Sequence, residues 1–291
     1  MDKDHEKLML DLNRLMAAAN LKTKEDYERF GKEMMGKTIP RFEKEALSKE
    51  EQAQDLVYQA SESEDLFQAD KMVFKALQLD PDCVEAYEFM GDQALSPLQS
   101  LLFFKLGFTA ARKKLGEKFV KENKGHFWGL HETRPYMRCL KSYAECLYML
   151  DQKDDALNTY FELLELNPND NQGNRDYASL YCLELNKFIK YQSLHKQYND
   201  DATAFHHFNY ALFQFISKGD CEESRTALAE ARSVNNHVLQ LMLSKKELPE
   251  LPATFGFGDK NEAIFYCTFA KDVWQNKKGA IEWLSLVYNK R

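Results

Sequence analysis

A short segment near the middle of the chain concentrates side chains of the kinds that often carry out chemistry. It reads HFWGLHETRP and contains His126, Trp128, His131, Glu132 and Arg134. His131 or Glu132 could act as a general base, with Arg134 as a clamp for an anion. The same residues also suit a structural role, in which Trp128 fills a helix junction while Glu132 and Arg134 pair and cap helix ends. Both interpretations remain open at this stage.

The sequence lacks the known signatures of metal, nucleotide and nucleophile sites. It contains no Walker-type glycine loop, nucleophile elbow, H-E-x-x-H motif or Rossmann fingerprint. His206 and His207, with His237, would chelate a metal poorly, because adjacent residues on a helix point about 100° apart. The 6 cysteines form no C-x-x-C pair, so we expect reduced thiols that fill the core. We therefore predict no metal, no cofactor and no enzymatic activity.

The HFWGLHETRP segment leads into two predicted helices that share a buried face. Apolar and small residues recur three and four positions apart, which is the spacing of one helix face. A polar turn at Asp151–Asp154 separates the helices, and the pair ends at Asn167-Pro168 because proline cannot continue a helix. The first stripe is Leu140, Tyr143, Ala144 and Leu147, and the second is Ala156, Tyr160, Leu163 and Leu164.

This helix pair resembles a tetratricopeptide repeat, a helix–turn–helix unit of about 34 residues. The first stripe takes the first-helix positions of its pattern, and Ala156, Tyr160 and Pro168 take the alanine, aromatic and proline of the second helix. One such pair cannot bury its apolar face alone, so neighbouring pairs are expected. The resemblance implies an all-α fold, a tetratricopeptide-like helical-repeat superhelix or α-solenoid.

A more specific resemblance covers roughly residues 120–285. The C-terminal part is similar to the suppressor-of-tumorigenicity-7 proteins of animals, with an Asn-His-Val segment and a lysine- and proline-rich loop. Here Asn236 and Leu239 replace two prolines of that family, so this turn is expected to differ. The family implies no settled activity. A group of uncharacterised bacterial tetratricopeptide-like proteins is similar in the segments GHFWGLHETRPYMR, LNPNDNQGNR, YNDDATAFHHFNYALFQF, NNHV, GDKNEAIFYC and KKGAIEWL.

Three regions follow from the helical pattern. Residues 1–48 are predicted to form N-terminal capping helices, and residues 49–243 to form the repeats. The spacing from Pro81 to Pro168 is not a whole multiple of the repeat, which predicts a long-helix insertion near 96–133. Residues 244–291 combine a Pro/Gly loop with a C-terminal capping pair. The individual helices are expected at 5–19, 23–36, 50–81 (a pair), 83–94, 97–121, 170–185, 187–198, 202–217, 220–234, 261–275 and 278–288, with a short helix or turn at 41–47 and a loop at 123–133.

Composition and charge limit the cellular environments and the kinds of partner that are compatible with the chain. Hydrophobic residues make up 44% and charged residues 29% of the chain, and no apolar run approaches the roughly 18–20 residues of a membrane span. The charged start MDKDHEKLML lacks the apolar region of a signal peptide. We therefore expect a cytoplasmic protein. Net charge is -7, yet Lys105–Lys141 is strongly basic. This segment is either a solvated helix or a surface for nucleic acid or another anion.

A tetratricopeptide groove is lined mainly by the first helices of its repeats. Here that implies Arg138, Lys141, Tyr148 and Arg175 as partner contacts, with the HFWGLHETRP residues at the rim. Basic residues beside aromatic ones suit a protein or peptide with acidic and apolar side chains. The leading hypothesis is thus a non-catalytic binding scaffold. Nucleic acid is disfavoured by the acidic remainder of the chain, and an enzyme centred on HFWGLHETRP is the third alternative. The face formed by Phe205, Phe208 and Phe215 is either groove or core.

Overall fold

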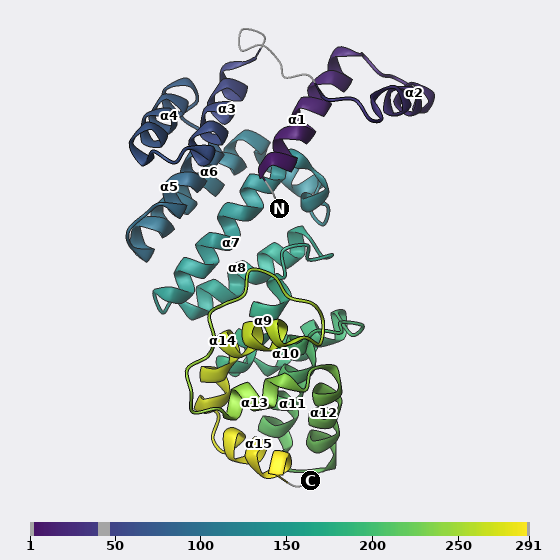
Figure 1. Ribbon diagram of the computed structural model, residues 1–291, viewed down its shortest axis with the longest axis vertical. Coiled ribbons are helices and arrows are strands. Elements are labelled where there is room, and N and C mark those ends of the chain that lie inside the picture. Colours follow the sequence, from purple (N-terminus) through teal and green to yellow (C-terminus); the bar gives the residue numbers. More distant parts are fainter. Residues whose placement is uncertain (1–2, 40–46, 290–291) are drawn as a thin grey trace. The chain divides into compact units, whose positions relative to one another are not determined.

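The computed structural model describes residues 3–39 and 47–289, and the regular structure in these ranges is entirely helical, as predicted (Figure 1). The expected short helix or turn at 41–47 lies, except for Leu47, outside the described residues. None of the described helices combines the length and the apolar character that crossing a bilayer requires. The chain divides into two compact units, residues 1–152 with 165–169 (unit 1) and residues 153–164 with 170–291 (unit 2). The sequence contains no linker at this division, which falls within α8 (Lys153–Leu166).

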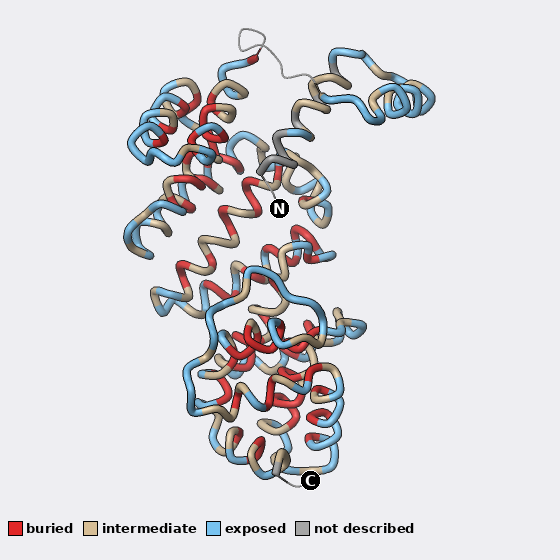
Figure 2. Tube along the Cα trace, viewed as in Figure 1, coloured by how far each residue is buried: buried red, intermediate tan, exposed pale blue. Residues whose placement is uncertain are grey.

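Unit 1 is built from successive packed helices. α3 packs on α4, α5 on α6 and α6 on α7, while α3 and α7 both also contact α5. Alanines at these contacts, such as Ala53, Ala69 and Ala86, are fully buried and let the helices approach closely. Figure 2 shows the buried residues along the facing sides of these helices. The helices are α1 (Lys3–Ala18), α2 (Lys24–Met34), α3 (Lys49–Glu62), α4 (Leu66–Leu79), α5 (Val84–Asp92), α6 (Pro97–Glu122) and α7 (Arg134–Met149).

Local sequence signals set the ends of several unit 1 helices. Ser48 and Glu51 form a capping box at the start of α3, and Thr23 with Asp26 forms one at α2. Proline opens both α6 and α7. The long helix predicted at 97–121 is present, but it is interrupted at Gly116, whose φ of 77° lies outside the helical region. Only glycine adopts that conformation readily, and this explains the break.

In unit 2, helices that precede and follow α11 in the sequence pack around it. Phe205 and Phe208 on α11 are 3% and 0% exposed, so this face is core, and Phe215 stacks on Trp283 with ring centroids 4.6 Å apart. The predicted pairs are present, while α13 was not predicted. The helices are α8, α9 (Asn174–Glu184), α10 (Phe188–Gln197), α11 (Ala204–Lys218), α12 (Glu222–Val234), α13 (His237–Leu243), α14 (Lys260–Asn276) and α15 (Ala280–Asn289).

Candidate functional site

The HFWGLHETRP segment forms two short 3₁₀ turns, η2 (Phe127–Gly129) and η3 (His131–Thr133), which lead directly into α7. Phe127 is fully buried and meets Tyr136 edge-to-face at 5.7 Å, while Trp128 is only half-buried. The Thr133 hydroxyl donates to the carbonyl oxygens of Phe127 and Leu130 and ties the two turns together. Phe127 is therefore the fully buried aromatic side chain at this junction, while Trp128 is only partly covered.

Trp128 and Arg134 instead form a partly exposed pair. Arg134 Nε donates to the Trp128 carbonyl at 3.1 Å, and its guanidinium lies 5.6 Å from the centre of the Trp128 ring. A guanidinium over an aromatic face is a favourable cation–π arrangement. His126, at the start of the segment, is exposed. The contacts between Trp128 and Arg134 give these two residues a role in the local structure.

His131 and Glu132 line a cavity of about 290 Å³ in unit 1, which we call the acidic cavity. Its walls come from α3, the start of α5, α6, η3 and the start of α7. Carboxylates dominate this lining, with Lys114 and His131 as its basic side chains. The full lining is Glu50, Glu51, Gln54, Tyr58, Asp80, Cys83, Val84, Glu85, Lys114, His131, Glu132 and Pro135.

Three of the five carboxylates in the acidic cavity have partners within the chain. Glu51 accepts from the Ser48 backbone N–H at 2.8 Å and from Arg14 at 2.8 Å. Although desolvation acts in the opposite direction, these bonds lower the pKa of Glu51. Asp80 accepts from Lys114 Nζ at 2.5 Å.

Glu85 accepts from Gln54 Nε2 at 2.6 Å, and burial raises the pKa of Glu85. Glu50 and Glu132 are both exposed, and neither forms a hydrogen bond or ion pair with its side chain in the part of the chain that the structure describes. The carboxylate charge of the acidic cavity is therefore only partly offset, because Lys114, the one lysine in its lining, interacts electrostatically with both Asp80 and Glu50.

The predicted partner contacts on α7 are largely engaged with unit 1 itself. Arg138 makes two parallel bonds to Glu88, Nε to Oε1 at 2.7 Å and Nη2 to Oε2 at 2.8 Å. The two side chains are only 18% and 9% exposed. Lys141 lies 4.0 Å from Glu145 one turn further along, and Tyr148 is half-buried. Arg138 is therefore a structural ion pair between α7 and α5.

The basic Lys105–Lys141 segment is also largely paired. Seven of its cations have a carboxylate within 4.0 Å, which reduces the field that a nucleic acid would meet. Two of the pairs, Lys113–Asp82 and Lys114–Asp80, hold α6 to the loop that precedes α5. The others are Arg112–Glu117, Lys118–Glu122, Lys124–Glu165, Arg138–Glu88 and Lys141–Glu145.

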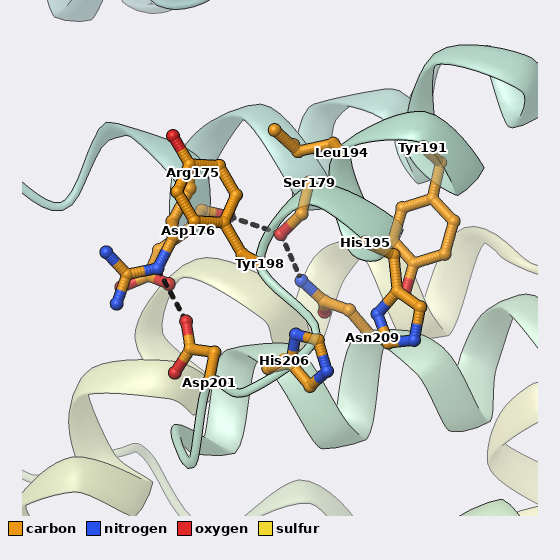
Figure 3. A pocket seen from close by; sticks show the side chains of 10 residues that line it. All are labelled: Arg175, Asp176, Ser179, Tyr191, Leu194, His195, Tyr198, Asp201, His206 and Asn209. Carbon is orange, nitrogen blue, oxygen red and sulfur yellow. Dashed lines mark hydrogen bonds and ion pairs between the residues drawn. The ribbon is translucent and has the colours of Figure 1, made fainter. Parts of the chain in front are cut away.

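Arg175, the remaining predicted contact, belongs to unit 2 and lines a separate small pocket (Figure 3). Its Nε donates to Asp201 at 2.5 Å and its Nη1 to Asp170 at 3.2 Å. Asp170 also accepts from the backbone N–H groups of Asn174 and Arg175, the first two residues of α9. Arg175 thus secures the start of α9 to the segment before α11. In Figure 3, Arg175 meets Asp201 at one end of the pocket.

The other end of this pocket holds a polar network. Tyr266 donates to Asn209 Oδ1 at 3.1 Å, and Asn209 Nδ2 donates to Ser179 at 2.9 Å. Tyr191 is 1% exposed, and its hydroxyl has no hydrogen-bond partner among the described residues. The free volume is about 20 Å³, which is enough for about one water molecule and too little for an organic ligand.

Two histidines close this pocket. His195 on α10 stacks on His206 of α11 at 4.1 Å and on Tyr210 at 4.4 Å. Burial and the proximity of His206 lower the pKa of His195 to about 4, and burial also lowers that of His206. The structure therefore brings His206 against His195, a residue that the sequence analysis did not single out.

Cysteine and metal-ligating side chains are the remaining candidates for chemistry at these sites. The cysteine in the acidic cavity, Cys83, is 2% exposed, and burial raises the pKa of its thiol, which keeps it protonated. No group of three or more His, Cys, Asp or Glu side chains among the described residues is placed to hold a metal ion. No family model, curated protein or solved structure matches this chain.

Sequence reasoning identified His131 and Glu132 at the acidic cavity but missed its other acidic residues. One signal was available. Ser48 followed three residues later by Glu51 is a capping box, and it marks where α3 begins. The remaining acidic residues come from helices that are far apart in sequence, and no local pattern brings them together.

Proposed function

We propose that the protein is a non-catalytic helical scaffold and that the acidic cavity of unit 1 binds a basic segment of a partner protein. The observation that carries this proposal is the lining of the cavity, in which carboxylates outnumber basic side chains and in which Glu50 and Glu132 are exposed and form no hydrogen bond or ion pair among the described residues. A cavity of about 290 Å³ is close to the lower end of the roughly 300–1,000 Å³ typical of ligand sites. It suits one or two side chains rather than a whole cofactor.

The negative charge of the acidic cavity indicates that its partner carries basic side chains. The sequence alone favours an acidic and apolar partner, because Arg138, Lys141 and Arg175 look available. Their contacts with Glu88, Glu145, Asp170 and Asp201 leave them less free to bind, whereas the cavity retains negative charge. Lysine and arginine side chains are complementary to it, and such complementarity contributes to on-rate and specificity.

The location of the cavity supports a peptide rather than an isolated ion. Its walls come mainly from α3 and the start of α5, together with the segment that leads into α7, and α3 and α7 correspond to first helices of the predicted repeats. A groove on first helices is the expected binding surface if the helices of unit 1 form a tetratricopeptide-like superhelix. A rigid helical wall would bind a peptide without being ordered in the process, which lowers the cost of association.

The test compares two full-length variants with the same net charge. Glu50→Gln/Glu132→Gln neutralises the two exposed carboxylates of the cavity, and Glu33→Gln/Glu64→Gln neutralises two exposed ones elsewhere in unit 1. The probe is a dye-labelled heptapeptide of alternating lysine and alanine, followed by fluorescence anisotropy. We expect the cavity variant to weaken binding at least fivefold and the control variant less than twofold.

A peptide with glutamate in place of lysine tests whether the cavity prefers positively charged peptides to negatively charged ones. Equal losses in both variants would show that net charge alone attracts the peptide and would overturn the proposal. Equal affinity for the lysine and glutamate peptides would do the same. Binding that weakens with added salt only in proteins that retain the cavity carboxylates would support a specific electrostatic contact.

A further inference from the structure

The loop between α13 and α14 in unit 2 presents an exposed, irregular stretch that the proposed function does not use. Residues 246–252, which read KELPELP, form its middle and are called the proline segment here. Within the described chain, no backbone–backbone hydrogen bond outside the helices involves residues 245–255. The Lys246 N–H donates to the Ser244 hydroxyl at 3.1 Å, and the other main-chain groups of the segment are available to solvent or to a partner.

The residue order favours an extended conformation over residues 248–252. Pro249 and Pro252 each fix their own φ near −65°. Leu248 and Leu251 each precede a proline, which disfavours the helical region and leaves β or polyproline II. Of residues 248–252, only Glu250 is free of such a restriction. The chain is therefore biased toward a polyproline II helix before any partner binds.

A polyproline II helix has three residues per turn, and this sorts the segment into three ridges. Lys246, Pro249 and Pro252 share one ridge, and Leu248 with Leu251 forms the second. The third ridge carries both acidic residues, Glu247 and Glu250. As a polyproline II helix, the segment is thus amphipathic. Its two apolar ridges are adjacent, the proline ridge begins with Lys246, and the acidic ridge faces away from both.

Exposure and anchoring show how the segment is presented. Lys246, Pro249 and Leu251 are exposed, with Leu251 at 50%, while Leu248 and Pro252 are half-buried. The ends are held from α14. Lys271 Nζ donates to the Ser244 carbonyl at 2.9 Å, and Asn261 Nδ2 donates to the Thr254 carbonyl at 3.2 Å. Between these anchors, the segment can lift Leu248 and Pro252 outward without breaking a backbone hydrogen bond.

We propose that the proline segment is a docking motif for a partner domain with an aromatic-lined groove that recognises polyproline II ligands. Such grooves take the P-x-x-P pattern, because its ridges fit between aromatic side chains and its extended shape is largely preformed. The two Leu-Pro pairs fill successive pockets. Lys246 lies one turn before the first of them, so the groove carries an acidic group at that end, and this fixes the direction in which the segment binds.

The experiment uses the full chain, two double-alanine variants and the single variant Lys246→Glu. The probe is an isotope-labelled SH3 domain of the type that takes a cation at the N-terminal end of its P-x-x-P ligand. Its chemical-shift changes are followed as the unlabelled protein is added. Pro249→Ala/Pro252→Ala removes the two prolines, and Glu247→Ala/Glu250→Ala alters the acidic ridge. Circular dichroism and thermal unfolding check that all three variants fold.

We expect saturable binding of the wild type at the aromatic groove, weakened at least tenfold by loss of the prolines. The acidic-ridge variant keeps the wild-type affinity within about threefold, and Lys246→Glu weakens binding. The proposal is overturned if the wild type shows no saturable shift or if both double variants lose binding equally. It is also overturned if loss of the prolines leaves the affinity unchanged. Because this segment lies in unit 2, its failure would leave the acidic cavity proposal intact.

Discussion

Arg138 shows that a side chain predicted from the sequence to be exposed can instead hold two helices together. It lies on the polar side of the predicted helix, yet its guanidinium forms a two-bond pair with Glu88, 9% exposed, on α5. A buried ion pair contributes little net stability compared with apolar residues of the same size, but breaking it leaves an uncompensated charge. Replacing Arg138 would therefore test the fold before it tests any ligand.

We predict that Arg138→Met lowers the free energy of unfolding by about 3–5 kcal/mol, because Glu88 is left buried without its partner. The double variant Arg138→Met/Glu88→Met should recover most of that loss. Urea unfolding followed by circular dichroism measures both. Lys141→Met on the same helix is the control, with an expected change under about 1 kcal/mol because its 4.0 Å pair is partly exposed. A similar small change for Arg138→Met would mean that the pair does not form.

The stacked histidines of unit 2 predict a loss of stability in acid. Burial lowers the folded-state pKa of His195 to about 4 and also lowers that of His206, so the unfolded chain takes up protons first as the pH falls. The contribution of these two neutral histidines is complete above pH 6.5 and is lost as the pH falls toward 4. His207 and Arg175 oppose protonation of His206, while Asp200 and Asp201 favour it.

Urea midpoints between pH 7.5 and pH 4.5 check this prediction. His195→Phe keeps a ring in the stack but does not titrate, so its midpoint should fall less steeply with acid than that of the wild type. His126→Ala, at an exposed histidine of unit 1, should keep the wild-type pH dependence. Parallel profiles for His195→Phe and the wild type would show that the stack does not govern acid sensitivity.

At the scale of elements, hydrophobic periodicity predicted most helices because each helix buries one face. Val57 on α3 and Val73 on α4, for example, are buried on such faces. The short helix α13 was missed, since its seven residues provide fewer than two full turns of pattern. The break in α6 depends on the φ of Gly116, and a glycine in a helical pattern does not by itself predict a break.

The candidate site was less predictable than the helices, for a physical reason. Glu50 and Glu132 meet at one cavity only because α3, α5 and α7 pack side by side, and no sequence spacing encodes that juxtaposition. The partners in ion pairs are equally hard to predict from sequence. Arg138 and Glu88 are 50 residues apart, and Arg175 and Asp201 are 26 apart, beyond the reach of helical periodicity. Sequence reasoning therefore identified residue types capable of binding but not the partners that already occupy them.

At the scale of the whole molecule, a continuous repeat array and two units with separate cores predict different unfolding behaviour. In a continuous array, each helix pair is stabilised by its neighbours, and a destabilising change is felt along the stack. Units with their own cores unfold more independently. The three tryptophans can distinguish the two cases, because Trp128 lies in unit 1 while Trp274 and Trp283 lie in unit 2.

In a Trp128→Phe background, tryptophan fluorescence reports unit 2 alone. We expect Leu180→Ala, at a fully buried position of α9, to lower the urea midpoint of that signal, with a cost of about 2–5 kcal/mol. Val57→Ala, at a 2% exposed position of α3, should lower the circular dichroism midpoint but leave the fluorescence midpoint unchanged. If Val57→Ala shifts the fluorescence midpoint as well, the two units unfold together, which is the behaviour of a continuous superhelix. A variant's effect on binding in one unit would then have to be corrected for stability lost in the other.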